Sequence, residues 1–262
     1  MKIARFEHSG RRLYGEVEAE TLHVVGGDVY SAPVRTGEKV ALRDVTLLSP
    51  SDPATLLIML GGFLKGGATL PAGARPNVMA KVVKSVTGHG SVIRVPSFVT
   101  TKPYVECELA IVIGKAVRHA SVEEARKAIW GYTCFNDVTA PEFMMDFEKG
   151  GLLAEPHLFA AKSHETFAVM GPWVRTDLGD DEIARGLQIT TRVNGAVAAG
   201  GSTLAQKWPG SVVVSYVSRY VQLEPGDVIA LGTPQPCEAG PGDTVEVEVE
   251  GIGTLTNTIA SG

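Results

Sequence analysis

Two glutamates separated by one residue stand in the segment 104–114, which reads YVECELAIVIG. Because side chains alternate along a β-strand, Glu106 and Glu108 would point to one face and the apolar Cys107 and Leu109 to the other. Two carboxylates at this spacing lie about 7 Å apart at their Cα atoms, and they repel each other unless water or a cation separates them. The apolar run that follows predicts a buried strand, which favours a bound divalent cation over solvent.

A third acid, Asp137, ends the apolar segment GYTCFNDV and stands shortly before Pro141. Functional ligands often stand where a strand gives way to a loop, although a lone Asp more commonly caps a turn. Three carboxylates without clustered His or Cys suit Mg²⁺, Mn²⁺ or Ca²⁺ rather than zinc. The six histidines show no HxH or HxxxH pairing, so a histidine-based metal site is not predicted.

The alternative for the glutamate pair is a strand with one wet, acidic face. The segment 243–251, DTVEVEVEG, has the same alternation, and we interpret its three glutamates as facing solvent. Spacing alone therefore leaves both interpretations open for Glu106 and Glu108.

The composition predicts a globular protein: the chain has 262 residues, 44% of them apolar and 20% charged. This composition excludes disordered, collagen-like and coiled-coil classes. The net charge of −5, without any run of Lys or Arg, disfavours nucleic acid as a partner. Three scattered cysteines indicate a reduced protein, and no apolar run approaches the ~20 residues of a membrane helix. We therefore expect a soluble, cytoplasmic protein with no membrane contact.

Short strand patterns separated by turns dominate the chain. The first fifty residues read as short strands, which predicts a small N-terminal β domain over 1–48 and a second domain over 49–262. A helix is predicted over 121–132, where Ser121 and Glu124 have the spacing of a capping box, and another around 212–220. An Asn-Gly pair at 194–195 predicts a hairpin turn. The pattern is typical of a mostly β, α+β protein with a few helices on an antiparallel or mixed sheet.

Six segments occur in an order that resembles the fumarylacetoacetate hydrolase family over about 47–262: ECELAIVIGKAV, GYTCFNDVTA, FAAKSHETFAVMGPW, LQITTRVNGAV, LEPGDVIALGTP and PGDTVEVEVEGIGTLTN. The resemblance implies a rolled, barrel-like mixed β-sheet with a few peripheral helices behind the small N-terminal β domain, and a homodimer. It also implies that Glu106, Glu108 and Asp137 hold Mg²⁺ or Mn²⁺.

The resemblance assigns two further positions. Lys162, in AAKSHETF, matches a lysine that contacts the oxo or enolate oxygen of the substrate, where a cation stabilises developing charge. Thr233, in GTP, matches a threonine that binds a substrate carboxylate. Without the resemblance, we would interpret Lys162 as a surface salt-bridge residue and Thr233 as part of a strand-ending turn.

The chain departs from the family pattern where hydrolysis is concerned. Hydrolases of the family carry a His and a Glu that activate water just after the first core strand, and the segment 60–70 here, LGGFLKGGATL, contains neither. The family usually has an arginine shortly after the metal-binding aspartate, but the run Thr139 to Glu142 contains none. His164 stands where an aromatic residue is usual. Glu142 or His164 could supply a substitute base.

These observations predict a divalent-metal-dependent enzyme acting on a small 2-oxo acid or 1,3-dicarbonyl compound. The resemblance implies C–C bond cleavage, by hydrolysis or decarboxylation, through a metal-stabilised enolate. A tautomerase, isomerase or hydratase acting on similar substrates is the alternative, because loss of the His and Glu removes only the hydrolytic part. A catalytically impaired metal-binding relative is the second alternative. A Gly-rich loop in place of a lid would also suit a bulkier, less acidic substrate.

Overall fold

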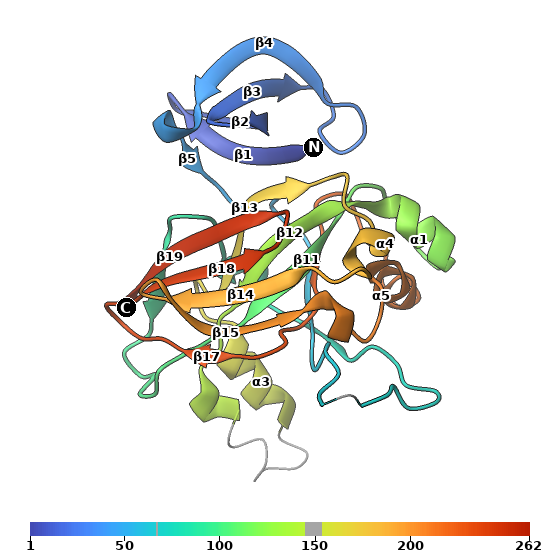
Figure 1. Ribbon diagram of the computed structural model, residues 1–262, viewed down its shortest axis with the longest axis vertical. Helices are drawn as coiled ribbons and strands as arrows, with labels where there is room; N and C mark the ends of the chain where they lie inside the picture. Colours follow the sequence, from blue (N-terminus) through green and yellow to red (C-terminus); the bar gives the residue numbers. More distant parts are fainter. Residues whose placement is uncertain (67, 145–153) are drawn as a thin grey trace.

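The computed structural model describes residues 1–66, 68–144 and 154–262. Two large β-sheets form the body, and short helices lie at its periphery (Figure 1). The larger sheet has twelve strands in the order β4-β3-β2-β1-β13-β12-β11-β16-β6-β7, with β5 paired to β1 and β8 paired to β13. Within the described ranges, no helix combines the length and apolar character needed to cross a bilayer.

The strands of the larger sheet have these bounds: β1 Lys2–His8, β2 Arg11–Glu18, β3 Thr21–Gly26, β4 Val34–Ala41, β5 Thr46–Leu47, β6 Leu56–Met59, β7 Val78–Ala80, β8 Val86–Thr87, β11 Cys107–Ile113, β12 Ile129–Asp137, β13 Ala168–Arg175 and β16 Val228–Ala230. The second sheet has five strands in the order β15-β14-β18-β19-β9. Its strands are β9 Val92–Val95, β14 Gln188–Val193, β15 Ala196–Ser202, β18 Thr244–Val249 and β19 Gly253–Ser261.

A two-stranded ribbon joins β10 Tyr104–Val105 to β17 Cys237–Glu238. The helices are α1 Val122–Ala128, α3 Ala154–Lys162, α4 Asp180–Ile183 and α5 Gly210–Val217, and the 3₁₀ turns are η1 Leu42–Asp44, η2 Val83–Ser85 and η4 Thr203–Ala205. Mixed sheets with few helices confirm the predicted fold class, and both sheets keep free ends in the described chain instead of closing into a barrel.

The alternation predicted for the central strand β11 is present. Cys107, Leu109 and Ile111 belong to the larger apolar core with residues of β14, β18 and β19, whereas Ala110 and Val112 belong to a second core on the opposite face. All seven residues of β11 are buried. A strand with both faces covered has no wet side, so any carboxylate on it must find a charged or polar partner.

The N-terminal strands β1 to β5 lie at the top of Figure 1 and are joined to the body by one short strand pairing and by an apolar core that includes Ile3, Val25 and Val112. Strand β1 pairs with β13 only through Lys2↔Arg175 and Ile3↔Val174. The N-terminal strands have a small apolar core of their own, which includes Phe6 and Leu22. A domain division near residue 48 remains our proposal.

The helix predicted over 121–132 begins where expected but ends earlier. Ser121 caps α1 and Glu124 completes the capping box, as predicted. The helix stops at Ala128 because the next residues enter the buried strand β12. There Gly131 lies against the backbone of β13, so that a Cβ at this position would meet the carbonyl oxygen of Arg175 at 2.5 Å.

Two glycines cross at the end of β6, next to the loop that follows β16. A Cβ on Gly62 would lie 1.9 Å from the carbonyl oxygen of Leu231, and Gly232 adopts a φ of +86° directly beside Gly62. We expect Gly62→Ala to lower the free energy of unfolding by about 1–3 kcal/mol, because the backbone must shift to admit the methyl group. Urea denaturation measures this change. Gly26→Ala is the control, because a Cβ there meets only Thr36 Cγ2, at an ordinary 3.4 Å. Equal stability of the two variants would contradict the expectation.

Candidate active site

Three carboxylates converge from two neighbouring strands. Strands β11 and β12 run antiparallel, and the backbone N–H of Asp137 donates to the carbonyl oxygen of Glu106 at 3.1 Å. One oxygen from each of Glu106, Glu108 and Asp137 lies within 4.8 Å of the others. The three residues are 8%, 1% and 2% exposed. The wet-face alternative for the glutamate pair is therefore wrong, and the structure brings the predicted triad together.

Glu108 is the carboxylate of this triad whose negative charge is least compensated by neighbouring cations. Its Oε2 accepts a 2.7 Å hydrogen bond from the backbone N–H of Gly232, and no lysine contacts it in the described chain. Burial raises the pKa of Glu108 well above its usual value, and the charges of Asp137 and Glu106 raise it further. The site therefore holds an acidic group that favours a proton or another cation.

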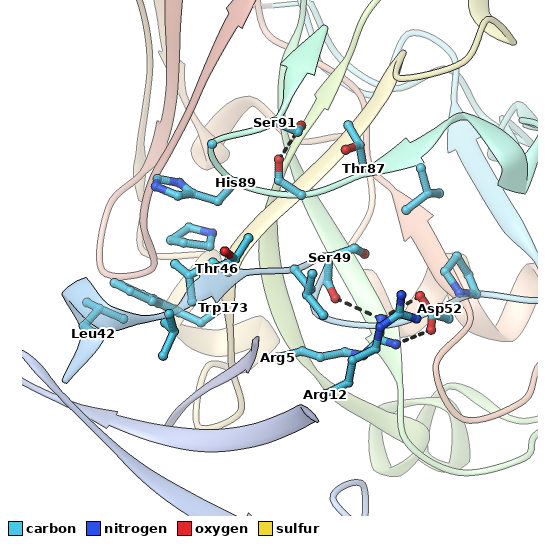
Figure 2. A pocket seen from close by; sticks show the side chains of 18 of the residues that line it. Arg5, Arg12, Leu42, Thr46, Ser49, Asp52, Thr87, His89, Ser91 and Trp173 are labelled. Carbon is cyan, nitrogen blue, oxygen red and sulfur yellow. Dashed lines mark hydrogen bonds and ion pairs between the residues drawn. The ribbon is translucent and has the colours of Figure 1, made fainter. Parts of the chain in front are cut away.

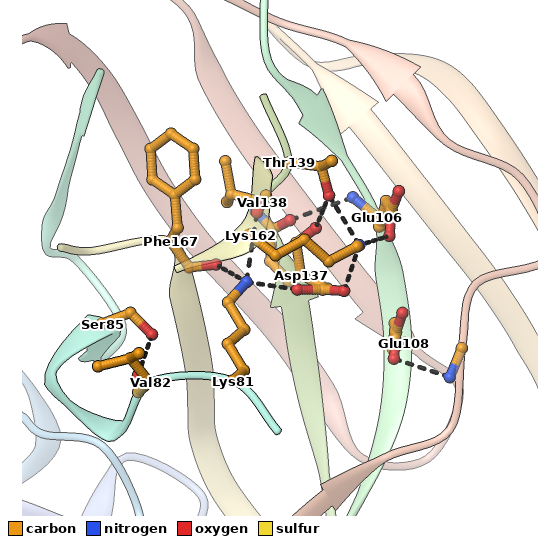
Figure 3. Close-up of polar contacts among 12 residues, drawn as sticks. Lys81, Val82, Ser85, Glu106, Glu108, Asp137, Val138, Thr139, Lys162 and Phe167 are labelled. Atoms are coloured by element: carbon orange, nitrogen blue, oxygen red, sulfur yellow. Dashed lines mark hydrogen bonds and ion pairs between the residues drawn. The ribbon is translucent and has the colours of Figure 1, made fainter. Parts of the chain in front are cut away.

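Lys162, the last residue of α3, points its ammonium group into the triad (Figure 3). Its Nζ donates to Glu106 Oε2 at 2.8 Å, to Asp137 Oδ2 at 2.5 Å and to Thr139 Oγ1 at 2.8 Å. Burial alone would lower the pKa of Lys162, but Asp137 and Glu106 outweigh it and raise the pKa. Lys162 is 2% exposed, so the surface salt-bridge interpretation is wrong. A lysine held as ammonium is a hydrogen-bond donor and not a base.

A second buried lysine, Lys81, contacts the same aspartate. Its Nζ donates to Asp137 Oδ1, to the carbonyl oxygen of Phe167 at 2.7 Å and to that of Val138 at 3.2 Å. Burial lowers the pKa of Lys81, whereas Asp137 opposes the change. Burial alone would raise the pKa of Asp137, but Lys162 and Lys81 outweigh it and lower the pKa. Asp137 is thus the fixed anion of the site.

The residues present fit a hard divalent cation. Oxygens bound to one such ion at about 2.1–2.4 Å lie no more than about 4.2–4.8 Å apart, and one oxygen from each carboxylate lies within 4.8 Å of the others. Each carboxylate keeps free lone pairs, because an ionised carboxylate offers about four acceptor positions. Three ionised acids face two lysines, which leaves a net charge of −1 that favours a bound cation.

Lys81 was not among the predicted site residues, although the residues around it indicate burial. It stands in the run VMAKVV, which is apolar on both sides. We expect Lys81→Met to lower the free energy of unfolding by about 3–5 kcal/mol, because Asp137 and two buried carbonyls each lose a donor. Lys84→Met, at an exposed position three residues later, is the matched control in chemical denaturation. A loss below about 1 kcal/mol in Lys81→Met would refute this structural role.

Glu142 lies near the loop 98–101 and is held by it. Its carboxylate accepts hydrogen bonds from the backbone N–H groups of Thr100 and Thr101 and from the Thr100 hydroxyl, at 2.8–3.2 Å. Burial alone would raise the pKa of Glu142, but these hydrogen bonds outweigh it and lower the pKa. A carboxylate stabilised in this way is a weak base. Its catalytic role stays a prediction.

His164 lies in an aromatic cluster. Its ring centroid is 4.8 Å from that of Phe167, 5.6 Å from that of Phe98 and 6.1 Å from that of Phe143. Burial lowers the pKa of His164, which favours the neutral imidazole. Its Nε2 atom is buried and has no hydrogen-bond partner among the described residues. His164 therefore has a proton-accepting nitrogen to offer, and its role as a base stays a prediction.

Thr233 follows the residue that holds Glu108. Its hydroxyl donates a 3.3 Å hydrogen bond to the carbonyl oxygen of Gln235 within the same turn. Thr233 is partly exposed, whereas Gly232 beside it is buried and donates to Glu108. The turn interpretation is compatible with this contact, and substrate binding by Thr233 stays a prediction.

The chain is similar to known proteins over nearly its whole length. Residues 65–260 match the family described as Fumarylacetoacetate (FAA) hydrolase C-terminal, and residues 1–50 match the one described as Rv2993c-like, N-terminal. The oxaloacetate tautomerase YisK of Bacillus subtilis (strain 168) is 32% identical over 84% of this chain and 74% of its own.

Two solved structures have the same fold. The 2-hydroxyhepta-2,4-diene-1,7-dioate isomerase from Mycobacterium marinum is 29% identical, with a TM-score of 0.87 over 100% of this chain and 98% of its own. Maleylpyruvate hydrolase from Sphingobium sp. SYK-6, in complex with manganese(II) and pyruvate, has a TM-score of 0.80 over 100% of both chains. At 20% identity, this second likeness concerns the fold alone.

Proposed function

Since the chain belongs to the fumarylacetoacetate hydrolase family, we propose that it is a divalent-metal-dependent tautomerase of a small 2-oxo dicarboxylic acid such as oxaloacetate. Glu106, Glu108 and Asp137 are the proposed ligands of Mg²⁺ or Mn²⁺, and Ca²⁺ is a further candidate by the same oxygen-ligand argument. A bound dication withdraws electrons from a chelated 2-oxo acid and so stabilises its enolate.

The observation that carries the proposal is the contact set of Lys162. All three N–H donors of its ammonium group are engaged, two by carboxylates and one by the neutral hydroxyl of Thr139. Hydrogen bonds to charged acceptors are stronger than those to neutral ones. The bond to Thr139 is therefore the one that a substrate oxygen replaces at least cost. Lys162 would then donate a charge-assisted hydrogen bond to the enolate oxygen as negative charge develops there.

Tautomerisation does not require the His and Glu that segment 60–70 lacks. Keto–enol interconversion moves one proton between an oxygen and the adjacent carbon, so it consumes no water and breaks no C–C bond. Hydrolysis also needs a base that deprotonates water, and the segment 60–70 contains neither His nor Glu. The neutral imidazole of His164 is the proposed carrier of the proton, and Thr233 is the proposed contact of a substrate carboxylate.

Two similar proteins also support a tautomerase. A tautomerase of oxaloacetate and an isomerase of a hydroxylated diene dioate are both similar to this chain at 29–32% identity. Both named reactions are consistent with chemistry through an enol. Decarboxylation remains the second candidate, because it needs the same electron withdrawal and no attacking water.

Three assays on the metal-loaded enzyme separate the candidate reactions. Decay of the enol absorbance of oxaloacetate reports tautomerisation, coupled formation of pyruvate reports decarboxylation, and loss of an acylpyruvate reports hydrolysis. We expect fast enol decay with Mg²⁺ or Mn²⁺ and pyruvate formation no faster than in buffer. Pyruvate formation that keeps pace with enol decay would replace this proposal with a decarboxylase.

A fourth outcome concerns the impaired-relative alternative. If no substrate turns over while Mn²⁺ still binds, the chain is a metal-binding relative that has lost catalysis. Turnover of bulkier oxo acids alone would instead favour the roomier pocket that the Gly-rich loop suggests. We also propose that the chain is a homodimer, which light scattering coupled to size exclusion tests directly.

A further inference from the structure

A cleft lies between the N-terminal strands and the body (Figure 2), and none of the three carboxylates of the cluster lines it. Its volume is about 1080 Å³, slightly above the roughly 300–1,000 Å³ that is typical of pockets that bind small molecules. None of the proposed metal ligands, Lys162 or Thr233 lines it. Such pockets occur preferentially where domains meet.

The cleft exists because one edge of β13 is only partly paired. Strand β8 pairs with this edge at Ala168 and Val169, and β1 pairs with it at Val174 and Arg175. Between these two pairings, the stretch of β13 that includes Pro172 and Trp173 has no strand partner on this edge in the described chain. Pro172 and Trp173 line the cleft at this gap.

The charge of the cleft is opposite to that of the chain. Four cations (Arg5, Arg12, Arg43 and Lys84) and one acid (Asp52) line it, which gives a formal charge of +3, whereas the whole chain carries −5. Arg5 engages both carboxylate oxygens of Asp52, so the only acid of the lining is already neutralised.

The other three cations keep donors available. The Nε atoms of Arg12 and Arg43 lie 3.8 Å from carboxylate oxygens of Glu7 and Asp44, respectively. This distance is too long for a hydrogen bond, and exposed ion pairs of this kind contribute little to stability. Lys84 forms no ion pair within the described ranges. Arg12 and Arg43 belong to the N-terminal strands and η1, whereas Lys84 belongs to η2 on the other wall.

His89 adds a neutral donor. The backbone N–H of Thr256 donates to its Nδ1 at 3.2 Å, which assigns the hydrogen of a neutral ring to Nε2. Burial lowers the pKa of His89 and so favours this neutral form. The remaining lining is largely apolar, including Leu42, Val86 and Trp173.

We propose that this cleft binds a small organic anion with an apolar body, held by Arg12, Arg43 and Lys84 from both walls. Guanidinium and ammonium groups recognise phosphate and carboxylate alike, so both chemistries are candidates. Because the ligand contacts both walls, its binding ties the N-terminal strands to the body.

Isothermal titration calorimetry of the metal-loaded full chain tests the proposal with two aromatic dianions, phenyl phosphate and phthalate. We expect at least one to bind with a Kd below about 1 mM. The triple variant Arg12→Ala/Arg43→Ala/Lys84→Ala should weaken this binding at least tenfold, because it removes three of the four cations. Arg118→Ala/Arg185→Ala/Arg219→Ala removes three exposed cations that lie outside the cleft and should leave binding unchanged.

The Glu108→Gln variant separates this cleft from the proposed active site, because dianion binding should persist in it. Binding of phenyl phosphate alone would identify a phosphate ligand, and binding of phthalate alone a carboxylate ligand. Binding of neither probe would overturn the proposal. Equal binding by the wild type and the cleft variant, or loss of binding in Glu108→Gln, would overturn it as well. Thermal melting of each variant confirms that it is folded.

Discussion

Glu108→Gln should lose metal-dependent turnover while the metal-free protein keeps its stability. Burial already favours the neutral form of this carboxyl group, and a glutamine has nearly the same shape. Its amide oxygen can accept the hydrogen bond from Gly232 that Glu108 now accepts. The anionic ligand, however, is gone. We expect Mn²⁺ affinity to fall by more than the roughly 10- to 100-fold that the loss of even an outer contact costs.

Two measurements check this expectation together: Mn²⁺ titration followed by calorimetry, and urea denaturation without metal. Glu248→Gln is the matched control, because Glu248 lies on β18, partly exposed, and pairs with Arg192 at 2.6 Å. It should leave Mn²⁺ affinity unchanged. Unaltered Mn²⁺ binding in Glu108→Gln would exclude this residue as a ligand.

Lys162→Met should lose turnover while it keeps its affinity for Mn²⁺. The variant keeps all three proposed ligands and removes the ammonium group that would face the enolate oxygen. Loss of one preorganised donor to a developing oxyanion typically lowers kcat by about 10²–10³. Mn²⁺ affinity should hold or rise, because a positive charge next to Glu106 and Asp137 has been removed.

Saturation kinetics at several Mn²⁺ concentrations distinguish the two effects. Lys115→Met, at an exposed position, controls for the general loss of a lysine. A variant that lost Mn²⁺ affinity and regained full kcat at high Mn²⁺ would show that Lys162 organises the ligands and does not stabilise the transition state.

Local patterns in the sequence predicted much of the site. Alternation in the segment 104–114 placed Glu106 and Glu108 on one face, and the capping box placed the start of α1 at Ser121. The same alternation could not decide between a wet and a buried acidic face. That decision depends on what covers the glutamate face: Lys162 reaches Glu106 from 56 residues away, and Gly232 reaches Glu108 from 124 residues away.

Long-range contacts account for what the sequence did not predict. Lys81 reaches Asp137 across 56 residues, and its run of apolar neighbours indicates burial but not the partner. Both the short pairing of β1 with β13 and the cleft beside it depend on which strands share an edge. No spacing within either segment encodes that choice.

The crossing of Gly62 and Gly232 has a consequence for how this protein can change. A side chain on Gly62 would meet the backbone of Leu231, and one on Gly232 would meet the backbone of Gly62; Gly232 also carries the N–H that holds Glu108. A mutational library at either position should therefore return glycine among its active clones, whatever substrate is selected. Between Gly62 and β7, Gly66 and Gly73 have nothing within 4 Å of their Cβ positions, but both adopt a positive φ that disfavours other residues. Substrate specificity can therefore change through other residues, while Gly62 and Gly232 should be retained.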